Sequence, residues 1–350
     1  MNGAIETSAS RPGQAYLTTK RFGRVLLSLT FVLVLTVLVS SLLGSERVSL
    51  VRALTGPAED NVDALILLHI RLPRILLGLV VGGALSAAGA ALQALLRNPL
   101  AEPHIMGVSG GAALGGVIAL VIGKGADVSR ASLVPLGAFG GALATMAVIY
   151  RLGTVRGRVQ PYTLLLAGVV CNGFTGALIM FVNAIADFFQ AHGILFWLMG
   201  SLATQSYRLV GAIAAYVLIA AASLLLHARD FNALTLGEEG AQQLGVDVQR
   251  TRRVAFVASS FLVGAAVSVS GMIGFVGLIV PHVTRLLFGP DYRLLLPASM
   301  LLGGCFLVLA DTLARSLLGA VEIPVGVVTA LCGGPFFLYL LRREGGRNIV

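Results

Sequence analysis

Charged residues are scarce in this chain. Asp, Glu, Lys and Arg together make up 12% of its 350 residues, whereas 57% of the residues are hydrophobic. A soluble domain carries about 25% charged residues, so a soluble protein of this size is excluded. The composition instead predicts an all-α polytopic membrane protein.

Signatures of nucleotide and metal binding are also missing. The chain has no G-x-x-x-x-G-K-[ST] phosphate-binding loop and no H-E-x-x-H zinc motif. Its five histidines are scattered, and Cys171, Cys305 and Cys332 lie in apolar runs without C-x-x-C spacing. We therefore expect no enzyme activity, no metal site and no cofactor in this chain. Any ATP hydrolysis, with its bound Mg, would have to come from a partner ATPase.

Acidic residues are nearly absent from the apolar segments. A proton- or sodium-coupled carrier usually places them near the bilayer midplane, where a charge costs about 2.5–3.5 kcal/mol and therefore marks a site. Here Asp187 falls at a segment end, and Asp311 precedes Arg315 by four residues, a spacing that allows pairing on one helix face. This pattern argues against a stand-alone secondary carrier, which remains the alternative from a different class.

Apolar runs of membrane-spanning length are abundant. A bilayer core requires about 20 residues per helix, which predicts about ten transmembrane helices. The expected spans are Val25–Leu43, Ile75–Leu96, Ile105–Ile122, Leu133–Tyr150, Leu164–Ala186, Val210–Leu226, Val254–Ser270, Gly274–Phe288, Leu294–Leu318 and Pro324–Leu341. Leu50–Asp63 is polar and is expected to be an external loop. Phe188–Thr204 is apolar but short, and is expected at the outer surface.

The basic residues lie on one side of this predicted topology. An even number of spans puts both termini on the same side, together with four basic clusters at residues 20–24, 151–158, 229–253 and 342–347. The positive-inside rule identifies that side as the cytoplasm, and it explains the net charge of +9 without a nucleic-acid partner. We expect residues 1–21 and 343–350 to be cytoplasmic tails and residues 22–342 to be a single transmembrane domain.

Two polar motifs flank the second expected span. Arg71-Leu-Pro-Arg74 precedes it, and Arg97-Asn-Pro-Leu-Ala-Glu-Pro103 follows it. The prolines of the second motif end the helices on either side, and Asn98 can close the turn. The next segment, residues 107–112, is rich in glycine and serine and could line a passage for a bulky solute.

The coupling loop, which we define as residues 229–253, is the longest polar stretch in the body of the chain. Its centre, residues 232–245, reads as two short helices divided at Gly237 and ended at Gly245. Leu234, Leu236, Ala241 and Leu244 could form one apolar face. Because Glu238 and Glu239 would be repelled by anionic lipid, a protein partner is the better interpretation of this face.

These motifs together resemble the permease subunits of ABC importers for iron chelates, haem and cobalamin, from about residue 25 to residue 342. Further matches are Leu236-Gly-Glu-Glu, Gly274-Phe-Val-Gly-Leu-Ile-Val-Pro-His, Ala310-Asp-Thr-Leu-Ala-Arg315 and Glu322-Ile-Pro-Val-Gly. The resemblance implies a homodimer of ten-helix subunits with the solute path on the twofold axis. It also implies two cytoplasmic ATPase subunits and a periplasmic or lipid-anchored substrate-binding protein.

The resemblance also implies roles for individual positions. Arg71, Arg74 and Arg315 match residues that contact acidic side chains of the binding protein. Asn98 and Leu100 match a constriction at the cytoplasmic end of the path. A second constriction falls on Pro161 and Tyr162, where the small hydroxyl residues of the family are not evident. The positions expected to contact the ATPase are Leu236, Gly237, Glu238, Ala241, Leu244 and Gly245.

The expected function is therefore a permease in the plasma membrane, the cell inner membrane, of a bacterium or archaeon. It would move a metal chelate, either a ferric siderophore or haem, with cobalamin as the alternative. No residue in the sequence discriminates among these solutes.

Overall fold

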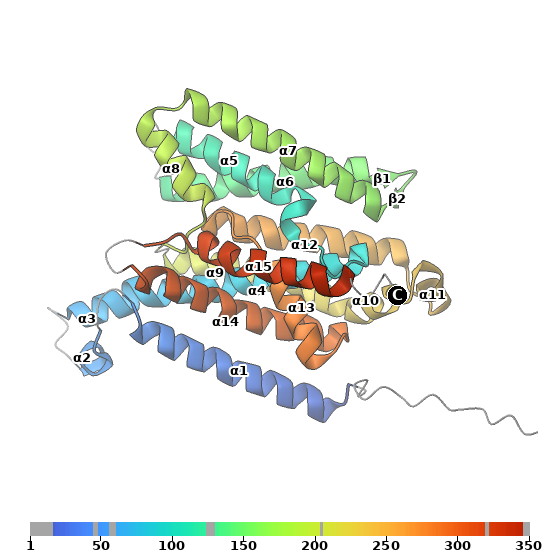
Figure 1. Cartoon of the computed structure of the whole chain (residues 1–350), viewed down its shortest axis with the longest axis horizontal. Coiled ribbons are helices and arrows are strands. Elements are labelled where there is room, and N and C mark those ends of the chain that lie inside the picture. The colour runs from blue at the N-terminus through green and yellow to red at the C-terminus, as the bar shows by residue number, and fades with distance from the viewer. Residues whose placement is uncertain are drawn as a thin grey trace, which may run out of the picture.

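The computed structural model describes residues 17–44, 48–55, 61–123, 130–203, 206–318 and 322–345. It is almost entirely helical, and its long helices lie side by side along the longest dimension of the molecule (Figure 1). Most of the expected N-terminal tail and the last residues of the C-terminal tail lie outside the described residues.

The elements divide into long and short ones. The long helices are α1 (Thr19–Leu42), α4 (Leu72–Leu96), α6 (Arg130–Gly153), α7 (Pro161–Ile185), α9 (Tyr207–Leu226), α12 (Val248–Ser270), α14 (Tyr292–Ser316) and α15 (Val325–Gly345). The shorter helices are α2 (Leu50–Thr55), α3 (Val62–Leu65), α5 (Val108–Ile122), α8 (Phe188–Leu198), α10 (Ala228–Leu234), α11 (Glu238–Gln243) and α13 (Val276–Phe288). A π-helical turn covers Ile66–Arg71, a 3₁₀ turn covers Pro103–Met106, and β1 (Thr154–Val155) pairs antiparallel with β2 (Arg158–Val159).

Seven helical stretches in the described part of the chain are long and apolar enough to cross a membrane. Shorter apolar stretches lie in α5, α8, α13 and α15. The all-helical fold is therefore confirmed, and length and composition fit a multi-pass membrane protein. The number ten and the side on which the termini lie stay predictions.

Helix ends depart from the hydropathy pattern where a polar side chain caps the first turn. Asp247 accepts a hydrogen bond from the Arg250 backbone N–H at 3.0 Å, so α12 begins six residues before the expected span. The expectation that the basic residues before Val254 all lie in a loop was wrong, because Arg250 to Arg253 occupy the first turns of α12. The expected external loop at Leu50–Asp63 likewise contains α2 and the start of α3.

The centre of the bundle is α4, which contacts α14, α12, α13 and α9. Two glycines allow these close approaches. A Cβ at Gly82 would lie 2.1 Å from the Gly303 carbonyl oxygen of α14, and a Cβ at Gly89 would lie 1.9 Å from the Gly277 carbonyl oxygen of α13. The helices therefore pack tightly at these two points, because the backbones themselves are in contact.

The two ends of the bundle carry different elements. α2, α3 and α8 lie at one end, whereas α10, α11 and the β1–β2 hairpin lie at the other (Figure 1). The Arg71–Arg74 motif forms the start of α4 at the first end, and the polar loop after α4 lies at the second. The candidate functional residues therefore fall into an arginine group at one end and a loop group at the other.

Candidate functional site

Five charged side chains form what we call the arginine cluster: Arg71, Arg74, Asp311, Arg315 and Glu322. The Arg74 guanidinium donates to both carboxylate oxygens of Asp311, at 2.9–3.1 Å, and to Glu322 at 2.9 Å. The Arg315 Nε lies 3.7 Å from Asp311, four residues earlier on α14. The predicted Asp311–Arg315 pair is therefore present, but Asp311 is held more closely by Arg74 from α4.

The remaining contacts of the cluster cap the end of α1. Arg71 donates to the carbonyls of Ser41 and Leu42 at 2.8 and 3.2 Å, and Arg315 donates to the carbonyl of Ser40 at 2.6 Å. The last carbonyls of a helix lack partners within the helix and carry its partial negative charge, so a cation here is favourable. These contacts join α1 to α4 and α14.

The three arginines lie together, as the docking prediction requires, but they are buried. Arg71, Arg74 and Arg315 are only 3%, 7% and 5% exposed, and their contacts given above are with groups of the same chain. The more exposed member is the carboxylate of Glu322, whose side chain is 54% exposed. Contact with a binding protein stays a prediction, and it now requires these guanidinium groups to turn outward in the complex.

The loop after α4 is closed by Asn98. Its side-chain oxygen accepts from the Leu100 backbone N–H at 2.9 Å, which forms the turn expected from the sequence. Asn98 is exposed and lines a cavity of about 280 Å³ with Arg97, Pro99 and other residues. Pro161 and Tyr162 line a separate cavity of about 610 Å³, which shares only Arg97 with the first. Within one chain these predicted constriction residues lie at the same end but do not meet, and their role stays a prediction.

Sequence reasoning missed a site in the middle of the bundle. The Glu102 carboxylate accepts a hydrogen bond from the Phe275 backbone N–H, and His104 Nε2 lies 2.8 Å from the Ile273 carbonyl oxygen. These contacts hold the non-helical segment 271–275 between α12 and α13. Phe275 has a φ of 68°, a left-handed conformation that is costly for a residue with a side chain.

This segment lines a cavity of about 560 Å³, together with Glu102, His104 and residues of α15. Non-helical backbone at membrane depth is tolerated only where it is buried in protein or lines a cavity. The signal in the sequence was Glu102, the acidic residue between Pro99 and Pro103, in a motif that the sequence otherwise explains as a turn between two helices.

The coupling loop contains the two predicted short helices, α10 and α11. Gly237 (φ 102°) precedes α11 and Gly245 (φ 78°) follows it, both in conformations that favour glycine. The Val246 N–H bonds to the Ala241 carbonyl, and the Gly245 N–H bonds to the Gln242 carbonyl. This Schellman motif ends α11 where the sequence predicted an end.

Half of the predicted apolar face of the coupling loop is buried and half is exposed. Leu234 and Ala241 are buried, at 4% and 0% exposure, whereas Leu236 and Leu244 are 69% and 64% exposed. The prediction of one continuous face was therefore wrong, because the first pair anchors the loop to the bundle. Glu238 forms an ion pair with Arg252 of α12 at 2.8 Å, so it also acts within the chain. Leu236 and Leu244 are the exposed residues of the predicted face, and their contact with an ATPase stays a prediction.

Asn232 fixes the base of the coupling loop on α14. Its amide donates to the Asp291 carboxylate and accepts from the Tyr292 N–H, both at 2.8 Å. Burial raises the pKa of Asp291, but hydrogen bonds from Arg293 and Asn232 outweigh it and hold that pKa below its usual value. Asp291 is therefore ionised at neutral pH and keeps the loop attached.

Metal ligation has no candidate in the described part of the chain, where no group of three or more His, Cys, Asp or Glu side chains could hold an ion. Cys171, Cys305 and Cys332 are free thiols.

Comparisons with known proteins match most of the chain. It is 47% identical over 286 residues to the cobalamin import system permease protein of Halobacterium salinarum, covering 80% of this chain and 74% of the relative. It is 41% identical over 330 residues to the hemin transport system permease protein of Yersinia pestis, covering 91% and 96%. A solved structure of a metal-chelate type ABC transporter in an inward-facing conformation matches with a TM-score of 0.80 and 34% identity, over 92% of this chain and 99% of that one. A profile of the FecCD transport family matches residues 31–343, and the chain belongs to that family.

Proposed function

We propose that the chain is the membrane subunit of a binding-protein-dependent ABC importer that moves a metal chelate into the cytoplasm. The solute class is a ferric siderophore or haem, with cobalamin as the alternative. ATP is hydrolysed by two copies of a separate cytoplasmic ATPase, and a binding protein delivers the solute from outside.

The exposed pair Leu236 and Leu244 is the observation that carries this proposal. Two large apolar side chains on a polar loop, beside the acidic α11, suit a protein surface better than anionic lipid. The rest of the loop is anchored to the bundle through Ala241, Glu238 and Asn232, so movement of the loop would be transmitted to α12 and α14. This is the arrangement that coupling to an ATPase requires.

The proposed topology has ten spans and both termini in the cytoplasm of a bacterial or archaeal cell. α5 and α13 are short for spans, since the 13 residues of α13 rise only about 20 Å against a core of about 30 Å. The non-helical segment 271–275 supplies the remaining length of that crossing. The end with α10, α11 and the β1–β2 hairpin faces the cytoplasm, because Arg158, Arg229 and Arg250 gather there.

The solute path forms between two copies of the chain. The cavity beside Glu102 and Phe275 is also lined by residues of α15. If the cavities of two chains faced each other, they would make a continuous passage. Asn98, Leu100, Pro161 and Tyr162 then close its cytoplasmic end. Exposed apolar faces on α7 and α15, including Phe174, Phe181 and Leu338, supply surface for the second copy.

Uptake of labelled solutes tests this function. Proteoliposomes containing the chain, its ATPase and its binding protein are given haem, a ferric hydroxamate or cobalamin at equal concentrations. We expect one of these to accumulate, and to do so only with the binding protein outside and active ATPase inside. Equal, slow entry of all three, independent of the binding protein, would contradict the proposal.

A further inference from the structure

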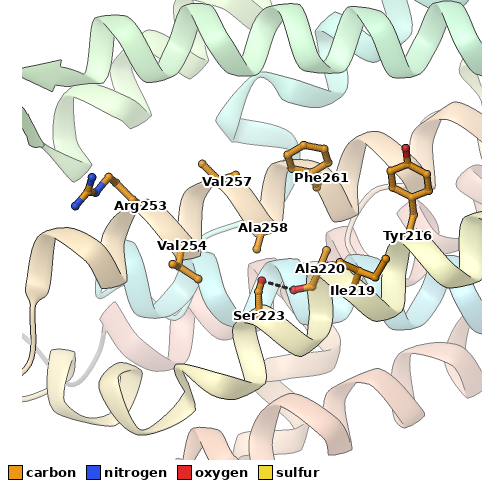
Figure 2. Close-up of a pocket in the computed structure, with 9 residues that line it drawn as sticks. All are labelled: Tyr216, Ile219, Ala220, Ser223, Arg253, Val254, Val257, Ala258 and Phe261. Carbon is orange, nitrogen blue, oxygen red and sulfur yellow. Dashed lines mark hydrogen bonds between the residues drawn. The ribbon is translucent and has the colours of Figure 1, made fainter.

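A groove between α9 and α12 lies apart from the residues to which we have assigned a role (Figure 2). It encloses about 490 Å³ and is lined by nine residues, of which five are aliphatic and two aromatic, the others being Ser223 and Arg253. None of the nine is acidic. The Ser223 hydroxyl donates to the Ala220 carbonyl at 2.6 Å, so its only hydrogen-bond donor is used within α9.

The groove is polarised along its length. Arg253 stands at one end, and Tyr216 and Phe261 stand at the other (Figure 2). Phe139 of α6 makes aromatic contacts with both rings, at centroid distances of 5.5 and 6.3 Å, so three aromatic rings gather at that end. A ligand that fills the groove must therefore be apolar along its body and anionic at the Arg253 end.

Its depth matches one leaflet of a bilayer. Eight residues separate Arg253 from Phe261 on α12, a rise of about 12 Å. Half of a bilayer core is about 15 Å, so the groove extends from headgroup level nearly to the midplane. The Arg253 end carries Arg229 and Arg250 as well, which identifies it as the cytoplasmic end.

We propose that this groove binds an anionic phospholipid of the cytoplasmic leaflet. One acyl chain lies along Val254, Val257 and Phe261, and the phosphate pairs with Arg253. Arg253 is exposed and forms no ion pair within the described part of the chain, so its charge is available to a headgroup. A free anion would gain no binding energy from the apolar walls of the groove. A protein segment would have to enter the groove from the lipid.

Native mass spectrometry of the delipidated importer assembly tests the proposal. The assembly is titrated with phosphatidylglycerol or phosphatidylcholine carrying the same acyl chains. We expect one tightly held phosphatidylglycerol per permease chain and weaker binding of phosphatidylcholine. Arg253→Gln should lower the phosphatidylglycerol affinity about fivefold, which corresponds to about 1 kcal/mol for one cation at the membrane surface.

Two further variants separate the groove from general surface attraction. Arg250→Gln removes the same charge one turn earlier on α12, outside the groove, and should bind phosphatidylglycerol like the unmodified chain. Val257→Trp fills the groove and should weaken both lipids, and Ile219→Trp does the same from α9 if the first variant does not fold.

Four results would overturn the proposal. They are equal binding of the two lipids, an equal loss in Arg250→Gln and Arg253→Gln, unchanged binding in both tryptophan variants, and competition by millimolar inorganic phosphate alone.

Discussion

Asp311 shows how much a single side chain can organise. It lies between Arg74 and Arg315, is 3% exposed, and connects α4 with α14. The sequence could predict only its partner four residues away, because helix periodicity covers that distance and no local rule reaches Arg74, 237 residues earlier. The same holds for Glu102 and Phe275, which are 173 residues apart.

Replacing Asp311 should be far more harmful than replacing Glu322, although both carboxylates bind Arg74. Asp311→Asn removes the buried counter-charge that Arg74 and Arg315 share and leaves Arg74 only the half-exposed Glu322. Breaking a buried pair in this way costs about 3–5 kcal/mol. Glu322→Gln removes a half-exposed partner and should cost less than about 1 kcal/mol. Thermal unfolding of the purified assembly compares the two. Equal midpoints for the two variants would show that Asp311 stabilises the fold no more than Glu322 does.

Glu102 should act through the backbone of Phe275. Glu102→Ala leaves the Phe275 N–H without its charged acceptor, a loss of about 1.5–3 kcal/mol, and lets segment 271–275 move. We expect severalfold slower uptake with assembly intact, and partial recovery in Glu102→Gln, whose amide oxygen can still accept. Initial uptake rates and size-exclusion profiles measure these effects. Equal uptake rates for Glu102→Ala and the unmodified protein would show that Glu102 has no role in transport.

At the scale of elements, hydropathy located the helices well and their ends poorly. Burial of about 20 apolar residues determines that a span exists, so both ends of α7 and α14 fall within about three residues of expectation, although α1 begins earlier than expected. Ends depend on capping and on tertiary contacts. Asp247 extends α12 into the basic cluster, whereas Gly271, with a φ of 66°, ends it and begins the non-helical segment 271–275 before α13.

The coupling loop provides a sharp test at this scale. Leu236→Asp and Leu244→Asp change exposed side chains, so the fold should survive while copurification of the ATPase falls at least tenfold. Leu65→Asp is the matched control, since Leu65 is 56% exposed at the opposite end of the bundle. Gly245→Arg should act like the leucine variants. A Cβ at residue 245 would meet open space, but the positive φ of this residue is strained for any side chain.

Ala241→Arg is unsuitable for this purpose, because Ala241 is fully buried and the substitution would damage the loop itself. Full retention of the ATPase by both aspartate variants would exclude Leu236 and Leu244 from the interface.

At the scale of the whole molecule, burial separates central helices from peripheral ones. Within the most apolar window, 83% of the residues are buried in the stretch that contains α4, but only 17% in α7 and 22% in α1. Helices exposed to this extent need lipid or a second copy of the chain around them. The fold and family were predictable from sequence, whereas a path between two copies could not be derived from one chain.

The source of energy for uptake distinguishes an ATP-driven importer from a secondary carrier. Proteoliposomes containing two copies of the chain, two ATPases and the binding protein are loaded with ATP, and uptake of the chelate is measured after ionophores collapse the proton and sodium gradients. We expect undiminished uptake that stops when ATP is replaced by a non-hydrolysable analogue. Uptake by the purified chain alone, driven by an ion gradient without ATP, would contradict this expectation and identify a secondary carrier.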